Sequence, residues 1–475
     1  MRQITKLLAA PCAAAVLTLG STMLAFGATG WVDESGTWVY YDNDGYQVTD
    51  SWKKTGDHWF YLDEDGEMAT DELIEYNDAY YYVNGDGAMV TNEWRRLDNN
   101  DYDEEDAPEA YWYYFGSNGK AYRSSSGATN FKTFKYQDGS SRRYAFDDQG
   151  RMLYGWVNES GERVSGDDAF MQGTYYCGEE NDGAQVYNDW RWLEAVDGDN
   201  EEPDFDDAYW FYFGSNGKKV SDTTKTINGR KYRFDENGAA ENRWYEVASP
   251  STVSNGHLYY NEPEECWLAT GWFKTVPSAE LDAEAHDNEE EYWFYGLSNG
   301  TLVRSQLKSV NGYRYGFNEK GEMLHGLYKL KFDSEMKITD YEKIEYESDI
   351  PDENDPEWNV YYFGNSPKEG VMETGKVTID IDGEKYTYNF KKSGREKGAG
   401  YEGIYDSSLY VEGRMLKADK DAKYQAFEYN NDRYLVNTSG KIMKSKTNTK
   451  DGDDKYYCTD KDGKITYESY EKYVK

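Results

Sequence analysis

Aromatic and apolar residues recur at a fixed interval near the start of the chain. Trp31, Trp52, Leu73 and Trp94 lie 21 residues apart. Between them, segments such as WFYLDEDG and YYYVNGDG place aromatic residues at alternate positions and then enter an Asp/Asn/Gly turn. Alternation is the period of a β-strand, and such turns suit a tight reversal of the chain. Each interval therefore predicts one short β-hairpin.

The other positions of the interval recur as well. Each copy has a turn glycine (Gly45, Gly66 or Gly87) and two residues later Met68 or Met89, with Gln47 as the exception in the first copy. A strict period of this length identifies a repeat protein. An isolated two-stranded hairpin is barely stable in water, so successive hairpins must bury their aromatic faces on one another. We predict an all-β solenoid of stacked β-hairpin repeats.

Beyond Trp94 the pattern continues inside longer cassettes. The aromatic strand returns from Trp112, Trp210 and Trp293, and in degraded form from Val360. A second hairpin with an Asp-Gly or Asn-Gly turn follows each of these strands, and the marks weaken after residue 394, where tryptophan disappears and lysine increases. We expect regular repeats over 28–94, elaborated cassettes over 95–395 and degenerate repeats over 396–475.

An acidic segment precedes each of the four later aromatic strands. Because such segments carry many like charges and few apolar residues, each predicts a long solvated loop inserted on one side of the solenoid. The four inserts span residues 98–109, 194–207, 280–291 and 345–357.

The first 27 residues differ from everything after them. Arg2 and Lys6 precede an apolar stretch from Leu7 to Leu24, and Ala25 to Gly27 supply small residues suited to cleavage. This arrangement is typical of a secretory signal peptide. Proline, glycine and hydroxyl residues interrupt the apolar stretch, which disfavours a membrane anchor. We predict that residues 1–27 direct secretion.

Composition narrows the classes of partner and chemistry. The formal net charge of −38 favours cationic partners and argues against nucleic acid. Cys177, Cys266 and Cys458 are too few and too far apart for a disulfide framework or a zinc cluster, so we interpret them as core residues without assigning any pairing.

Neither a metal site nor a catalytic site stands out in the sequence. The Asp-rich turns Asp42–Gly45 and Asp63–Gly66 lack the distal Glu of a calcium loop, so turn chemistry explains them better. The four histidines are isolated from any nucleophile, and acidic residues are too abundant for a glycosidase pair to be recognised. We expect no cofactor, no metal and no enzymatic activity.

The order Trp, aromatic strand, Asp-x-Asp-Gly, Met and Thr resembles the cell-wall-binding repeats of Gram-positive surface proteins, also known as choline-binding repeats. Residues 31–94 match this pattern and lack only the Trp at Leu73. The later segment TINGRKYRFDENG from Thr226 is similar to the repeats of glucan-binding proteins. The resemblance implies a secreted, wall-associated protein that binds a wall polymer, choline-substituted or carbohydrate, without membrane insertion after signal removal.

In choline-binding members of the family, ligands lie between successive hairpins in cages of aromatic rings with a methionine nearby. Such cages suit a quaternary ammonium group, which has no N–H to donate and is recognised by cation–π attraction. The same rings could instead build the core or stack on sugars. Carried onto this sequence, the resemblance implies three cages: Trp31, Trp38, Tyr40 and Trp52; Trp52, Trp59, Tyr61 and Met68; and Tyr80, Tyr82, Met89 and Trp94.

Two functions are compatible with these observations. The first is a secreted, non-catalytic cell-wall-binding protein that attaches to choline-like or carbohydrate groups of the bacterial envelope through cages between repeats. The second is an adhesin or scaffold whose solenoid face and acidic loops bind host glycans, extracellular glucan or another protein.

Overall fold

The computed structural model describes residues 29–99, 107–125, 127–195, 208–247, 256–353, 355–365 and 367–474. The predicted signal peptide, residues 1–27, lies outside the described residues. The chain forms two compact units, the first extending to Glu241 and including Pro263–Cys266, and the second made of Asn242–Glu262 and the chain from Trp267 onward. The boundaries predicted at residues 94 and 395 separate regular from irregular repeats. They are not boundaries between compact units, so they stay predictions.

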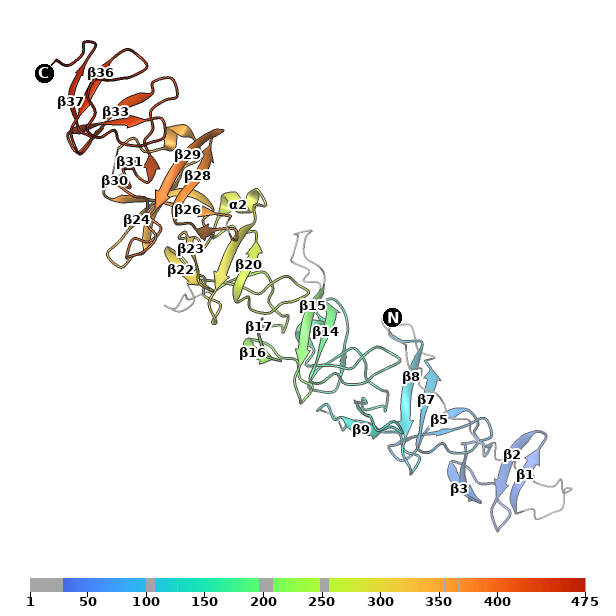
Figure 1. The fold of residues 1–475 in the computed structure, drawn as a ribbon. Coiled ribbons are helices and arrows are strands. Elements are labelled where there is room, and N and C mark those ends of the chain that lie inside the picture. Colours follow the sequence, from blue (N-terminus) through green and yellow to red (C-terminus); the bar gives the residue numbers. More distant parts are fainter. Residues whose placement is uncertain are drawn as a thin grey trace. The chain divides into compact units, whose positions relative to one another are not determined.

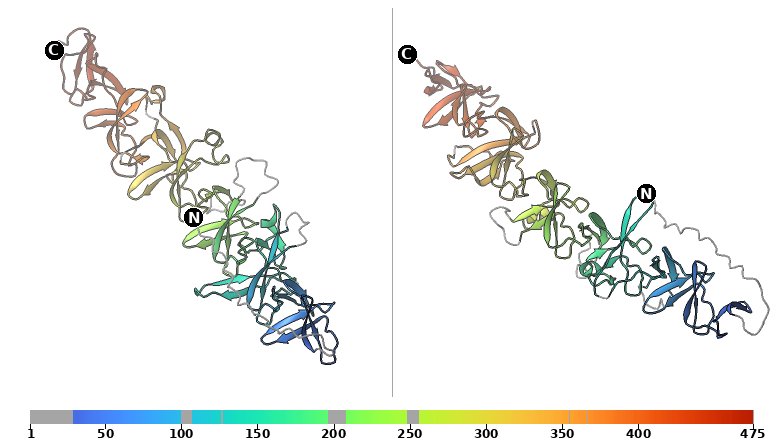
Figure 2. Two further views of the ribbon diagram at one scale, coloured as in Figure 1. Left: turned by 90° about the vertical axis from the view of Figure 1, so that its right-hand side faces the viewer. Right: turned by 90° about the horizontal axis from the view of Figure 1, so that it is seen from below.

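The first unit consists of short antiparallel strands, most of them joined in two-stranded hairpins, and one helical turn (Figures 1 and 2). Its elements are β1 (Gly30–Glu34), β2 (Thr37–Tyr41), β3 (Ser51–Thr55), β4 (His58–Leu62), β5 (Glu72–Glu75), β6 (Tyr80–Val83), β7 (Glu93–Asp98), β8 (Ala110–Phe115), β9 (Lys132–Lys135), β10 (Ser141–Tyr144), β11 (Trp156–Val157), β12 (Arg163–Val164), α1 (Ala169–Gln172), β13 (Tyr175–Tyr176), β14 (Asp189–Glu194), β15 (Ala208–Phe213), β16 (Thr223–Ile227) and β17 (Arg230–Phe234).

The second unit continues with hairpins but adds a four-stranded sheet, β25-β24-β26-β27, and a five-stranded sheet, β28-β29-β32-β31-β30 (Figure 1). Its elements are β18 (Trp244–Glu246), β19 (His257–Tyr259), β20 (Gly271–Thr275), α2 (Ala283–Asp287), β21 (Tyr292–Gly296), β22 (Gln306–Val310), β23 (Tyr313–Phe317), β24 (Gly326–Phe332), β25 (Ile338–Lys343), η1 (Glu347–Asp349), β26 (Trp358–Gly364), β27 (Val371–Met372), β28 (Gly375–Ile381), β29 (Glu384–Phe390), β30 (Gly403–Tyr405), β31 (Ser408–Val411), β32 (Arg414–Met415), β33 (Tyr424–Tyr429), β34 (Asp432–Asn437), β35 (Thr449–Lys450), β36 (Tyr456–Thr459) and β37 (Ile465–Ser469).

The turns after the aromatic strands are held by their own aspartates. In the second hairpin the Asp63 carboxylate accepts hydrogen bonds from the backbone N–H groups of Asp65 (3.0 Å) and Glu67 (2.8 Å), and Asp42 does the same in the first hairpin. These bonds satisfy backbone donors that the reversal would otherwise leave unpaired. The Asp-rich turns therefore serve turn formation, as the sequence indicates.

Successive hairpins are joined by one recurring backbone hydrogen bond. The N–H of Met68, which follows β4, donates to the carbonyl of Trp38 in β2 at 2.8 Å. The N–H of Met89 donates to the carbonyl of Trp59 at the same distance, one hairpin further on. The bond recurs between Met152 and Trp112. Each hairpin is thus registered on the one before it, which is how a solenoid repeat transmits its period.

Side chains reinforce that register through the turn glycines. The Met68 side chain lies against Gly87 of the next hairpin, so closely that a Cβ at Gly87 would meet its Sδ and Cε at 2.8 Å. Gly87 also has φ +76°, a conformation that other residues rarely adopt. We call these residue–glycine contacts the glycine ladder; its pairs in the first unit are Gln47/Gly66, Met68/Gly87, Met89/Gly119, Ala121/Gly150, Met152/Gly183, Gln185/Gly217 and Lys219/Gly238.

The glycine ladder also runs through the second unit and continues past residue 395, where the sequence predicts degenerate repeats. Met415 packs on Gly440 and Ile442 on Gly463, and β33 and β34 form a hairpin between them. The apolar residue and the glycine thus persist although the tryptophans do not. The second-unit pairs are Leu268/Gly300, Leu302/Gly321, Met323/Gly370, Met372/Gly398, Met415/Gly440 and Ile442/Gly463.

Two of the acidic inserts contain short helices. Residues 280–291 contain helix α2, in which Asp282 caps the first turn by accepting from the N–H of Ala285 at 3.2 Å. Leu281 packs in a core with Phe294 and Leu302. Residues 345–357 contain the short helix η1. Most side chains of these two inserts are exposed, as a solvated segment predicts, but short helices and the apolar contacts of Leu281 and Ile350 give them structure that a plain loop lacks. Most of 98–109 and 194–207 lies outside the described residues.

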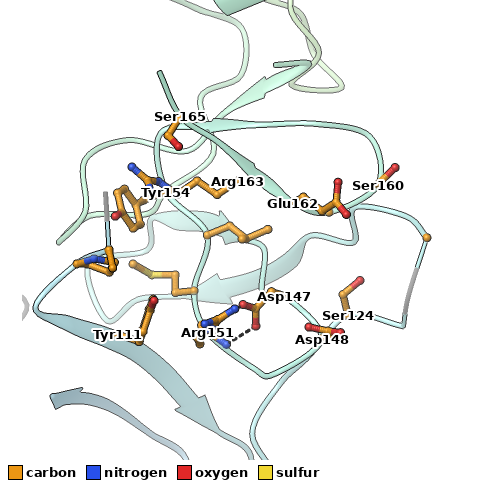
Figure 3. A pocket seen from close by; sticks show the side chains of 16 residues that line it. Tyr111, Ser124, Asp147, Asp148, Arg151, Tyr154, Ser160, Glu162, Arg163 and Ser165 are labelled. Carbon is orange, nitrogen blue, oxygen red and sulfur yellow. Dashed lines mark hydrogen bonds and ion pairs between the residues drawn. The ribbon is translucent and has the colours of Figure 1, made fainter. Parts of the chain in front are cut away.

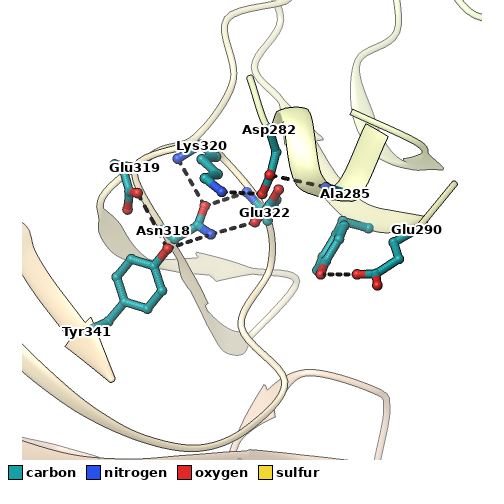
Figure 4. A network of polar contacts seen from close by, with 9 residues as sticks. Asp282, Ala285, Glu290, Asn318, Glu319, Lys320, Glu322 and Tyr341 are labelled. Carbon is teal, nitrogen blue, oxygen red and sulfur yellow. Dashed lines mark hydrogen bonds and ion pairs between the residues drawn. The ribbon is translucent and has the colours of Figure 1, made fainter. Parts of the chain in front are cut away.

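A polar network fixes the helical insert to the following hairpin (Figure 4). The Asp282 carboxylate forms an ion pair with Lys320, and Glu322 accepts a hydrogen bond from the side chain of Asn318 at 2.7 Å. Glu322 is only 5% exposed, and burial is the main cause that raises its pKa to about 7. The insert is therefore anchored by the ion pair of Asp282 with Lys320, which lies in the same turn as the buried Glu322.

Cys177, Cys266 and Cys458 are buried and free, as expected of core residues. Among the described residues, no helix has the length and apolar character needed to cross a membrane.

Candidate aromatic binding site

The first predicted cage is only partly assembled. Trp31 and Tyr40 are cross-strand partners whose ring centroids lie 5.3 Å apart. Phe60 of the next hairpin approaches Trp31 to 5.4 Å, and the Trp31 indole N–H donates to the Thr55 hydroxyl at 2.6 Å. In the described part of the chain, no ring contact joins Trp52 to this group. Phe60 thus takes the place that the sequence assigns to Trp52.

Of the second predicted cage, Trp52 and Tyr61 lie in contact, around the Trp52 ring. The Trp52 ring lies 5.1 Å from that of Tyr61 and 5.2 Å from that of Tyr81 in the next hairpin. Trp59 lies on the same strand as Tyr61 and is 39% exposed. The indole nitrogen of Trp52 is buried without a hydrogen-bond partner. We call Trp52, Trp59, Tyr61 and Tyr81 the Trp52 group.

The third predicted cage is divided between two clusters. Tyr80 and Tyr82 pack against the core around Phe115, with the Tyr82 and Phe115 rings stacked 6.1 Å apart. Trp94 instead contacts Tyr114 at 5.3 Å and Tyr144 at 4.9 Å. The structure therefore does not bring Trp94 together with Tyr80 and Tyr82.

The two predicted site methionines form a β-bridge with their own hairpin and also bond to the preceding one. Met68 reaches Trp38 and Met89 reaches Trp59 through their backbone N–H groups, while their side chains rest on ladder glycines. Each methionine therefore contacts a tryptophan of the previous repeat, Trp38 or Trp59. The cages predicted from the sequence did not place Met68 with Trp38 or Met89 with Trp59.

Sequence reasoning missed Phe60 and Tyr81 because it followed one set of alternate positions. In a strand, neighbouring side chains point to opposite faces. Tyr61 faces its cross-strand partner Trp52, whereas Phe60 contacts Trp31 of the preceding hairpin and Leu62 is buried on the same strand face as Phe60. The signal was present in WFYL, since apolar residues occupy both sets of positions and predict burial on both faces of the hairpin.

Charged side chains of the protein itself cover some of the predicted rings. The Lys53 ammonium lies 5.3 Å from the centroid of Tyr40, and the Arg95 guanidinium lies 5.9 Å from that of Tyr82. Among the described residues, no lysine or arginine lies over a ring of the Trp52 group. Burial, together with the adjacent Asp50 carboxylate, raises the pKa of Tyr61. Within the Trp52 group Tyr61 is therefore a buried core ring, Trp52 and Tyr81 are partly buried against it, and Trp59 is the exposed ring.

A separate polar cavity of about 460 Å³ lies further along the first unit (Figure 3). On one side the Arg151 guanidinium lies 4.7 Å from the Tyr111 ring centroid and forms an ion pair with Asp147 at 2.5 Å. On another side Arg163 lies 4.3 Å from the Tyr154 ring centroid. Ser124, Asp148, Ser160, Glu162 and Ser165 also line the cavity. The sequence did not single out this site, because its residues come from different repeats.

Within the described residues, no cluster of three or more His, Cys, Asp or Glu side chains is arranged to hold a metal ion.

The N-terminal repeats match a known family. The choline-binding repeat model matches residues 28–70 and 49–94. Two curated relatives are glucosyltransferases: Glucosyltransferase-I of Streptococcus downei is 24% identical over 384 residues, covering 75% of this chain and 22% of the relative, and Glucosyltransferase-S of Streptococcus mutans is 26% identical over 264 residues, covering 50% and 16%. The chain spans about a fifth of the length of these relatives.

Solved structures with detectable similarity include choline binding protein F from Streptococcus pneumoniae, 18% identical over 80% of this chain and 100% of that chain, with a TM-score of 0.36. The choline-binding domain of CbpL from the same organism is 24% identical over 50% of this chain and 97% of that chain, with a TM-score of 0.30. On the match over residues 28–94, this chain carries repeats of the choline-binding family.

Proposed function

We propose that this protein is a secreted, non-catalytic cell-wall-binding protein that attaches to choline-like or carbohydrate groups of the bacterial envelope. The observation that carries the proposal is the Trp52 group, in which the exposed Trp59 stands beside the partly buried rings of Trp52 and Tyr81, inside the segment matched by the family. The solved relatives named above are described as choline-binding, which supports the same ligand class. Secretion rests on the composition of residues 1–27.

The chemistry of the Trp52 group suits a weak site used many times. Each ring face attracts a quaternary ammonium by roughly 0.5 to 2 kcal/mol. Three faces together supply about 2 to 5 kcal/mol, close to the ~4 kcal/mol of a millimolar site. Several such sites along one polymer raise avidity by a factor on the order of 10² to 10⁴. Repetition thus turns a weak interaction into stable attachment.

Retention of the full chain on a choline-substituted resin, with elution by free choline, tests the proposal. We expect Trp59→Ala to weaken retention, because Trp59 is an exposed member of the Trp52 group. The matched control is Tyr46→Ala, which removes a ring that is 73% exposed in the neighbouring turn and lies outside the group. Failure of the protein to bind choline resin and purified wall material of its own organism would contradict the proposal.

The polar cavity of Figure 3 favours a second candidate, an adhesin or scaffold that binds a host glycan, extracellular glucan or another protein. Its arginines, carboxylates and serine hydroxyls can pair with the hydroxyl groups of a sugar, and its tyrosines supply apolar contact. Passage through choline resin combined with retention on immobilised glycan would favour this candidate. Because the match to the glucosyltransferases covers about a fifth of those enzymes, the proposal carries no glucosyl transfer over to this chain.

A further inference from the structure

The Trp-bearing hairpins share a pattern of two cross-strand pairs on one face. The inner pair is a tryptophan opposite a tyrosine, and it packs on the next hairpin. The outer pair lies two residues along each strand from the inner pair, toward the turn that joins the two strands. It places a second tryptophan opposite a residue that differs among the hairpins. The outer pairs are Asp33 with Trp38, Lys54 with Trp59, Arg96 with Trp112, Trp192 with Trp210, and Lys274 with Trp293.

The pair in hairpin β14–β15 differs from the other four. A charged residue stands opposite the outer tryptophan in those four hairpins, and Arg96 and Lys274 each contact an acidic side chain, Asp98 at 4.0 Å and Glu291 at 3.0 Å. In β14 the position holds Trp192. The substitution replaces a solvated charge with a second indole.

Trp192 is exposed although it lies beside a well-packed core. Its inner neighbour Trp190 contacts Tyr212 at 5.0 Å, Tyr232 at 4.7 Å and Phe234 at 5.6 Å. Trp192 itself contacts Trp210 at 5.4 Å and remains 40% exposed. The next hairpin therefore covers the ring of Trp190 but leaves the ring of Trp192 partly exposed. Trp192 thus presents an exposed indole beside a second indole, that of Trp210, at the outer end of the aromatic face.

The geometry of the two indoles selects among possible occupants. Their planes meet at 64°, edge to face. An edge-to-face pair leaves a flat ring surface open but does not enclose a cation from several sides, as a cage does. A flat, amphipathic indole suits the apolar C–H face of a pyranose ring. The exposed carboxylate of Glu194 lies on the same strand face as Trp192 and can accept hydrogen bonds from sugar hydroxyls.

We propose that Trp192 and Trp210 form a stacking platform for a neutral pyranose unit of a glycan, separate from the Trp52 group and from the cavity of Figure 3. The platform rests on the carbohydrate-binding part of the function proposed above and names the class of sugar for one site; loss of choline binding alone does not remove it, because it lies outside the Trp52 group.

Affinity electrophoresis of the full chain in gels containing dextran, laminarin or soluble mannan tests the platform. We expect at least one of these neutral polysaccharides to retard the protein. Trp192→Arg restores the residue type found at Arg96 and should weaken the association about tenfold, the effect of losing an aromatic anchor. Because Trp192 is exposed, the variant should keep the wild-type circular dichroism spectrum and Tm.

Two controls make the outcome specific. Arg96→Ala changes the equivalent position of hairpin β7–β8 and should leave retardation unchanged, and Trp59→Ala should weaken only choline binding. The proposal is overturned if none of the three polysaccharides retards the wild-type protein, if Trp192→Arg migrates as the wild type does, or if choline chloride displaces the glycan as well as free monosaccharide does.

Discussion

Hairpins β3–β4 and β14–β15 share their inner half and differ in their outer half. In both, an inner tryptophan faces a tyrosine across the strands, Trp52 with Tyr61 and Trp190 with Tyr212, and packs on the next hairpin. Only the outer partner changes, from Lys54 to Trp192. The inner half therefore builds the fold, and the outer half is free to vary with the ligand.

The comparison separates two roles that the same residue types play. A buried aromatic ring that contacts the next hairpin stabilises the solenoid whether or not a ligand binds. A ring at the outer position can be exposed without loss of stacking, as Trp59 and Trp192 are. Mutations at inner positions and in the glycine ladder should thus change stability, and mutations at outer positions should change binding.

The largest loss of stability is expected from a mutation in the glycine ladder, because both hairpins stack on their neighbours through it. At Gly87 a Cβ would meet the Met68 side chain at 2.8 Å and the Ala69 carbonyl at 3.2 Å, in addition to the strain of positive φ. We expect Gly87→Ala to reduce the free energy of unfolding by about 3 kcal/mol. Urea unfolding followed by tryptophan fluorescence measures the change.

Gly45 supplies a matched control for that variant. It has φ +80°, but a Cβ placed there meets no atom within 4 Å. Gly45→Ala should therefore cost about 1 kcal/mol, the backbone strain alone. Equal losses for the two variants would show that the close approach of Met68 to Gly87 contributes nothing to stacking.

The sequence predicted the hairpins well because their physics is local. Alternating aromatic residues, Asp-Gly turns and the 21-residue period all act within one repeat, and the structure confirms stacked hairpins. The glycine ladder was visible as the recurring Gly and Met, but its function depends on contact between repeats. Lys219 is an example of a ladder residue that the sequence does not reveal, because a lysine is not expected at a packed position. Its side chain packs on Gly238, and its ammonium lies 5.3 Å from the centroid of Trp156.

The grouping of site residues was harder to predict because it depends on how one hairpin turns relative to the next. Phe60 and Tyr81 enter the ring clusters from the opposite strand face, and Trp94 joins Tyr144, which lies 50 positions later in the sequence. The exposure of Trp192 equally depends on where the covering hairpin ends. A single sequence does not carry that information.

A second prediction concerns the acidic insert that is docked by the ion pair of Asp282 with Lys320, beside the buried Glu322. Because the folded state raises the pKa of Glu322 from 4.5 to about 7, folded protein binds this proton more tightly than unfolded protein does. The stability that this group contributes is present below pH 4.5 and is lost as the pH rises through 7. Glu322→Gln should remove the loss and stabilise the protein at pH 8 by roughly 2 kcal/mol.

Thermal unfolding of wild type and Glu322→Gln between pH 4.5 and 8 checks this prediction. The Tm difference should grow across that interval and level off above pH 8. Glu319→Gln is a suitable control, since Glu319 belongs to the same turn but is exposed. A Tm difference that does not change with pH would mean that Glu322 does not titrate in this range.

The smallest effect, and the most direct test of the comparison, is to give one hairpin the outer pair of another. In hairpin β7–β8, Arg96 faces Trp112 across the strands, and its side chain is 38% exposed. Arg96→Trp should create a second stacking platform and strengthen binding to the polysaccharide that retards the wild type by about threefold, because two weak sites on one polymer add avidity. Arg96→Leu, which removes the charge without adding a ring, is the control. If the leucine variant gained as much affinity as the tryptophan variant, loss of charge and not the indole pair would explain the behaviour of β14–β15, and the outer tryptophans would have to be treated as ordinary surface residues.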